Sequence, residues 1–138
     1  MEEGPALDHL RVIDFTHHVA GPYCTKLLAG FGADVVKIER PKTGDPERSL
    51  PPFAKNTGEA GDSVSFLWLN TGKKSIVLDL KTPSGRDKAL TLIRGADVVV
   101  ENFSPGVMQR LGLDYDAVKQ MNPNVIMLSI SNFGQTGP

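Results

Sequence analysis

Charged, polar and aromatic side chains that could hold a ligand follow apolar, β-type segments of this sequence. They are His17, His18, Arg40, Lys81, Asn102 and Phe103. Arg110 adds a third cation on a short helical segment just beyond Phe103. If the segments form a parallel sheet, these side chains gather beyond its carboxyl ends, where open sheets of this kind bind ligands. Several cations beside an aromatic ring indicate an anionic ligand with an organic body, such as a nucleotide.

The two histidines are neighbours in the loop "THHVAGP". Adjacent residues of an extended loop point to opposite sides, so His17 and His18 are poorly placed to ligate one metal ion, and we expect no metal site. Two interpretations stay open. One histidine could face a substrate while the other packs under the loop, or both could simply form loop surface.

Nucleotide-binding fingerprints are missing from the sequence. Neither G-x-G-x-x-G nor G-x-x-x-x-G-K-[ST] occurs, so a Rossmann dinucleotide site and a P-loop are disfavoured. One feature keeps a dinucleotide-dependent oxidoreductase open as an alternative. Glu39 ends an apolar segment, where a ribose-binding acid would stand.

The elements that must position these residues alternate along the chain. We expect five buried strands, near residues 10–15, 34–39, 75–80, 97–101 and 125–131. We expect helices over residues 23–31, 82–94, 104–112 and 114–122. This alternation predicts an α/β fold, a Rossmann-like open parallel sheet of about five strands with helices on both faces.

Two nearly repeated stretches, "GADVVKIERP" from Gly32 and "GADVVVENF" from Gly95, support this reading. Each predicts a helix that ends at a left-handed glycine and leads into a strand. Thr82 or Ser84 is expected to cap the helix that precedes Gly95, with Pro83 in its first turn.

One segment departs from the alternation. Residues 41–72 are rich in proline and glycine and show no clear period, which predicts a long mobile loop. Within it, Trp68 is expected to be a core residue.

Composition narrows the class of protein. The 138 residues suffice for one domain, or for part of a larger one, and 15 Lys and Arg against 16 Asp and Glu leave a net charge of −1. Nucleic acid is therefore not an expected partner. No apolar run is long enough to cross a membrane, and the acidic start does not resemble a signal peptide, so we expect a cytoplasmic protein. The single cysteine, Cys24, is expected to be a structural thiol.

Four blocks together resemble the amino-terminal portion of class III CoA-transferases, the formyl-CoA and carnitine-CoA transferase family. The blocks are "LRVIDFTHHVAGPYCTKLLAGFGADVVKIERP", "NTGKKSIVLDLK", "ADVVVENFSPGVMQRLGL" and "SISNFGQTGP". The resemblance implies a Rossmann-like large domain, a dimer of interlocked ring-shaped chains, and CoA or acyl-CoA as substrate with no permanently bound cofactor. It also implies covalent catalysis through an aspartyl-CoA intermediate, with a small carboxylic acid as acceptor.

The resemblance also implies roles for individual residues. Arg40 matches an arginine that meets the phosphates of CoA. Further CoA contacts match Leu78, Lys81, Asn102, Phe103 and Arg110. The loop of His17, His18, Val19 and Ala20 resembles the one that closes over the thioester and acyl group. Val19 stands where formyl-CoA transferases have a glutamine, which favours a larger or more apolar acyl group.

The family's nucleophilic aspartate lies a few tens of residues beyond the loop that ends this sequence, so the resemblance implies no catalytic residue in this chain. Asp14 and Asp79 follow strands as polar exit residues and are poor substitutes. Three functions stay open: the CoA-binding part of a CoA-transferase, a standalone CoA-binding or interaction module without catalysis, and a relative of α-methylacyl-CoA racemases. In each case uncovered apolar surface would favour a homo-oligomer.

Overall fold

The structure, a computed structural model, describes residues 4–54 and 63–136. Five parallel strands form one sheet in the order β3-β2-β1-β4-β5. The strands are β1 (Arg11–Asp14), β2 (Asp34–Glu39), β3 (Lys74–Val77), β4 (Val98–Glu101) and β5 (Ile126–Ser129). The predicted α/β class, the parallel sheet and the positions of all five strands are therefore confirmed. The expected burial is wrong for β3 and β5, which lie at the two edges of the sheet and whose residues are exposed or half-buried.

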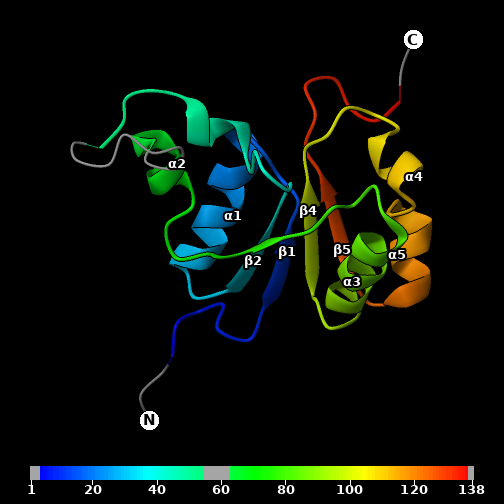
Figure 1. Ribbon diagram of the computed structural model, residues 1–138. Helices are drawn as coiled ribbons and strands as arrows, with labels where there is room; N and C mark the ends of the chain where they lie inside the picture. Colours follow the sequence, from blue (N-terminus) through cyan, green and yellow to red (C-terminus); the bar gives the residue numbers. More distant parts are fainter. Residues whose placement is uncertain (1–3, 55–62, 137–138) are drawn as a thin grey trace.

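Helices cover both faces of the sheet (Figure 1). The helices α1 (Ala20–Gly30) and α2 (Val64–Leu69) lie on one side, and α3 (Pro83–Arg94), α4 (Val107–Leu111) and α5 (Tyr115–Met121) lie on the other. From β1, the strands β2 and β3 follow one another toward one edge of the sheet, and β4 and β5 follow one another toward the other edge. The strand order therefore reverses between β1 and β4. Ligands of open α/β sheets bind in the crevice at this reversal.

The main core lies between the sheet and α3, α4 and α5. Its fully buried members include Ile13 of β1, Val99 of β4, Ile93 of α3 and Val118 of α5. A smaller apolar cluster on the α1 side contains Val12 and Val35, with Leu28 packed against it. Strand residues alternate between the two faces, as the period of two requires.

Helix ends follow local sequence signals, with one exception. The Thr82 hydroxyl accepts a hydrogen bond from the Gly85 amide at 3.1 Å and caps α3, as predicted. Gly32, after α1, has a positive φ of 106°, whereas Gly95 has φ −105°, so the left-handed cap predicted there is wrong. The amide of Gly95 instead donates to the carbonyl of Leu92, and this tighter turn ends the helix without a left-handed residue.

Residues 41–72 contain more regular structure than the sequence indicates. A 3₁₀ helix, η1 (Pro46–Ser49), and α2 both fall inside this range, while residues 55–62 lie outside the described part of the chain. Helices of four and six residues are too short to show a period, so contacts with the rest of the fold decide them. The mobility of the segment stays a prediction.

Trp68 is not a core residue, contrary to the sequence-based expectation. Helix α2 buries Phe66 and Leu69, which leaves Trp68 on the opposite side and 54% exposed. Its ring stacks on Tyr23 of α1 at a centroid distance of 5.7 Å, and the Lys26 Nζ lies 3.3 Å above it.

Among the described helices, none is long and apolar enough to cross a bilayer.

Candidate functional site

A cleft of about 760 Å³ opens at the carboxyl ends of the strands, where the loops after β1, β2, β3 and β4 meet. It collects most of the side chains singled out from the sequence. Those that line it are His17, His18, Arg40, Leu78, Lys81, Asn102 and Phe103. Residues from four separate strand ends therefore share one cavity.

Three predicted residues lie elsewhere. Ala20 begins α1 and lines a smaller adjoining hollow that Asn102 and Phe103 share. Val19 is 56% exposed and lines neither cavity. Arg110 is an exposed residue of α4 and does not line the main cleft. Their proposed contacts with a ligand stay predictions.

The loop after β1 is held by hydrogen bonds to its backbone atoms. The Asn102 side chain accepts a hydrogen bond from the His17 amide and donates one to the His17 carbonyl, both at 2.8 Å. Asn102 follows β4, so this pair of bonds joins the two loops on either side of the strand-order reversal. The sequence placed Asn102 in the site but did not indicate that it holds the loop.

His17 faces the cleft as a neutral imidazole. Burial lowers its pKa to about 4, aided by Lys37 and Arg40 and opposed by Asp45. Its ring lies against Phe103 at a centroid distance of 5.3 Å. Near neutral pH, His17 is therefore an uncharged ring at the wall of the cleft rather than a cation.

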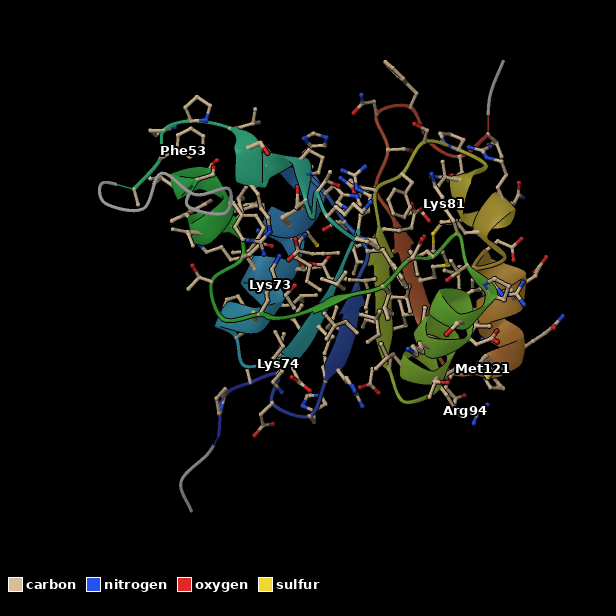
Figure 2. All side chains as sticks on the ribbon, viewed as in Figure 1. Phe53, Lys73, Lys74, Lys81, Arg94 and Met121 are labelled. Atoms are coloured by element: carbon tan, nitrogen blue, oxygen red, sulfur yellow. The ribbon has the colours of Figure 1, made fainter. Side chains whose placement is uncertain are left out.

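Arg40 and Lys81 supply positive charge at the mouth of the cleft. Both side chains are exposed, and Figure 2 shows Lys81 at the end of the sheet opposite to Arg94. The Arg40 Nε donates to the carbonyl of Gly44 at 3.2 Å, which leaves its terminal nitrogens free of any hydrogen bond within the described residues. An anionic group is the matching ligand chemistry.

Glu39 is not available to bind a ribose. Its carboxylate accepts two hydrogen bonds of 2.7 Å from Arg48, one from the Ser75 hydroxyl and one from the Asp45 amide. Burial alone would raise its pKa, but these bonds outweigh burial and lower the pKa to about 2. The feature that kept a dinucleotide oxidoreductase open is thus a structural ion pair.

Asp14 is likewise occupied. It is fully buried, its Oδ1 accepts from the Thr16 amide and hydroxyl, and its Oδ2 accepts from the Thr25 hydroxyl and from Lys73. Asp79 accepts a hydrogen bond from the Lys81 amide on the rim of the cleft.

Within the described ranges, no group of three or more His, Cys, Asp or Glu side chains could hold a metal ion.

Comparisons with known proteins agree with this geometry. The family model described as CoA-transferase family III matches residues 7–138. The chain is 50% identical over 130 residues to a formyl-CoA:oxalate CoA-transferase of Rhodopseudomonas palustris, covering 94% of this chain and 29% of that protein. For the enzyme of the same name from Afipia carboxidovorans, the identity is 47% over 129 residues, covering 94% of this chain and 30% of that protein.

Solved structures give the same result. A CaiB/BaiF family protein from Brucella suis superposes with a TM-score of 0.90 at 42% identity, over 99% of this chain and 36% of that one. A Mycobacterium tuberculosis protein gives a TM-score of 0.87 at 39% identity, over 98% and 37%. The chain spans about 30% of the length of the curated relatives. Because the model of this family matches residues 7–138, the chain belongs to CoA-transferase family III.

Proposed function

We propose that this chain is the part of a CoA-transferase that binds CoA and acyl-CoA. In the complete reaction, CoA moves between carboxylic acids through an aspartyl-CoA intermediate whose aspartate is not in this chain. The observation that carries the proposal is the single cleft that joins the exposed cations Arg40 and Lys81 to the neutral His17. Phosphates would meet the cations, and the thioester would meet the histidine loop.

The apolar part of the cleft suits the organic body of the ligand. Leu78 is half-buried at its wall, and Phe103 presents an aromatic ring there. An aromatic side chain beside cations can stack on a purine while the cations bind phosphate. The relatives are named for formyl-CoA and oxalate, whereas Val19 supports a larger or more apolar acyl group.

A calorimetric titration with CoA tests this proposal, with dephospho-CoA as the second ligand. We expect saturable binding that Arg40→Ala weakens by roughly tenfold or more, the effect of one charge-assisted hydrogen bond. Arg94→Ala is the matched control, because Arg94 is an exposed arginine at the opposite end of the sheet. Equal effects of the two substitutions would contradict the proposed phosphate site.

The same titration separates the two leading functions. Saturable binding that weakens with dephospho-CoA and in Arg40→Ala would mean that the site assembles in this chain alone, so that a standalone module stays open beside the transferase part. Absence of binding would favour a half-site that needs the remainder of a longer enzyme. The names of the curated relatives support a transferase over a racemase.

We also propose that the chain self-associates. Both edges of the sheet carry exposed apolar residues, with Val77 of β3 63% exposed and Ile126 of β5 64% exposed. Uncovered strand edges and apolar patches promote association. Sedimentation should show a dimer or larger species, and a strictly monomeric chain at high concentration would contradict the proposal.

A further inference from the structure

A fully buried ion pair lies behind the cleft without lining it. The Lys37 Nζ of β2 is 2.8 Å from the Asp45 Oδ2, and the two side chains are 1% and 0% exposed. Asp45 precedes η1 and caps it by accepting from the Glu47 amide. Neither Lys37 nor Asp45 can touch a ligand in the cleft, so any role in binding has to act through other residues.

One side of the pair holds the histidine loop. The Lys37 Nζ donates to the Thr16 carbonyl at 2.7 Å, and the Asp45 Oδ1 accepts from the His18 amide at 3.0 Å. His18 has φ 63°, a left-handed conformation that costs a non-glycine residue free energy and persists only where its surroundings impose it. The pair supplies a backbone hydrogen bond on each side of His17.

The other side of the pair holds the turn that carries Arg40. The Asp45 amide donates to Glu39 at 3.0 Å, while the Gly44 amide donates to the Arg40 carbonyl at 3.1 Å. The turn is thereby closed between Glu39 and Asp45, with the Arg40 side chain directed to the Gly44 carbonyl. One carboxylate, that of Asp45, belongs to this turn and bonds to the histidine loop.

Stability alone is a weak reason for such a pair. Removing two charges from water costs about as much as their attraction returns, and apolar residues of similar volume often stabilise a fold equally well. Burial alone would raise the pKa of Asp45, but the charge of Lys37 and the hydrogen bonds from the Glu47 and His18 amides outweigh it and hold the pKa below its usual value. What apolar residues could not supply is the directional bonding to Thr16 and His18.

We propose that Lys37 and Asp45 are positioning residues that set the histidine loop, Thr16–Ala20, at a fixed distance from the Arg40 turn, residues 40–44. The inference rests on the proposed function, in which the turn meets the phosphates and the loop meets the thioester. A ligand long enough to contact both the loop and the turn needs the correct distance between them, whereas a nucleotide fragment needs only the turn.

The test uses the double variant Lys37→Met/Asp45→Ala, which removes the pair and the acceptor for the His18 amide without leaving one buried charge unpaired. Its matched control is Lys74→Met/Asp34→Ala, the same residue types in an exposed ion pair, 71% and 41% exposed. Should the first variant not fold, Lys37→Gln/Asp45→Ala keeps a donor near Thr16 and still removes the acceptor for the His18 amide. Urea unfolding of each variant reports its global stability.

Two measurements are made on each chain. The first is amide hydrogen exchange of His18 without ligand, and the second is the affinity for acetyl-CoA and for adenosine 3′,5′-bisphosphate. In the buried variant we expect His18 to exchange about tenfold faster than its global stability accounts for. We expect acetyl-CoA affinity to fall about tenfold more than that of the bisphosphate, equivalent to one hydrogen bond. The exposed control should match the unmodified chain in both.

The outcomes separate the two proposals. If the unmodified chain binds neither ligand, the proposed function fails for this chain, and His18 exchange alone decides whether the pair positions the loop. Unchanged His18 exchange in the buried variant overturns the inference. If the chain binds both ligands, an equal fall in their affinities also overturns it, because the register between loop and turn would then not matter.

Discussion

The two faces of the sheet are built from the same strands but differ in chemistry. Toward α3 and α5, β1 presents Ile13 and is followed by Phe15, both part of the apolar core. Toward α1, β1 presents Val12 and then Asp14, which bonds to Thr25 of that helix. The α1 face is thus apolar where the strand begins and ionic where it ends, beside the cleft.

The second strand repeats the pattern. On β2, Val36 and Ile38 join the main core and Val35 joins the smaller cluster. Lys37 and Glu39 are buried and form ion pairs, Lys37 with the buried Asp45 and Glu39 with the partly exposed Arg48. One strand can contribute to both faces of the sheet, because each face receives every second residue. The face toward α3 and α5 mainly stabilises the fold, and the carboxyl end of the face toward α1 holds the loops.

The largest effect is expected from removing a carboxylate of the ionic face. Asp14→Ala should lower the free energy of unfolding by about 3–5 kcal/mol, since it leaves Lys73 charged and buried without its partner. Figure 2 shows Lys73 beside α1, and its side chain is 1% exposed. Urea denaturation measures the change. Asp14→Asn also removes the charge that pairs with Lys73, so it should cost nearly as much, and a small loss in this variant would contradict the charge-based explanation.

A truncation on the apolar face should have a comparable but smaller cost. Ile93→Ala removes a fully buried side chain of α3 and should lower the free energy of unfolding by about 3 kcal/mol. CoA affinity, measured by calorimetry well below the melting temperature, should stay unchanged because Ile93 does not line the cleft. A large loss of affinity in this variant would show that the two faces are not separate in function.

Acid should lower the free energy of unfolding because His17 is held neutral in the fold. Its pKa is about 4 in the fold and 6.5 when unperturbed, so below 6.5 the unfolded chain binds a proton that the folded chain does not. Stability is therefore full above pH 6.5 and falls with the pH, by about 2 kcal/mol near pH 4.5. Unfolding free energies measured across this range should show the slope, and His17→Gln should flatten it. An unchanged slope in that variant would assign the effect elsewhere.

Glu39 extends the acid loss to lower pH. Its pKa is about 2 in the fold against 4.5 unperturbed, so its contribution is present above 4.5 and disappears as the pH falls toward 2. This window lies below most of that of His17, so the slope that remains in His17→Gln below about pH 4.5 reports two ion pairs, Glu39 with Arg48 and Asp45 with Lys37. Glu39→Gln should reduce that slope, and an unchanged slope would assign it to other carboxylates.

The smallest effect is expected from an exposed ion pair. Lys74 and Asp34 lie 2.5 Å apart at the amino-terminal end of the sheet, and the Lys74 side chain is 71% exposed. Lys74→Ala should change the free energy of unfolding by about 0–1 kcal/mol, because water and salt screen such pairs. Denaturation in low and high salt checks this. A loss like that of Asp14→Ala would show that burial is not what separates the two kinds of pair.

The sequence predicted the strands and most of the cleft because those features depend on local pattern. Apolar β-branched runs mark buried strands, and the polar residues that follow them must lie at one end of a parallel sheet. Arg40, Lys81 and Phe103 were found in this way. The same reasoning failed at Trp68, because a helix as short as α2 does not reveal which side it buries.

The sequence by itself determined the fold class and the set of residues at the carboxyl ends of the strands, because period and turn residues act over a few neighbours. Only the tertiary structure decided how these residues are held. Asp45 lies 27 positions from His18, and Asn102 lies 85 positions from His17, yet each bonds to that loop. Hydrogen bonds between residues so far apart in the chain leave no periodic signal, so they become visible only when the strands are placed side by side.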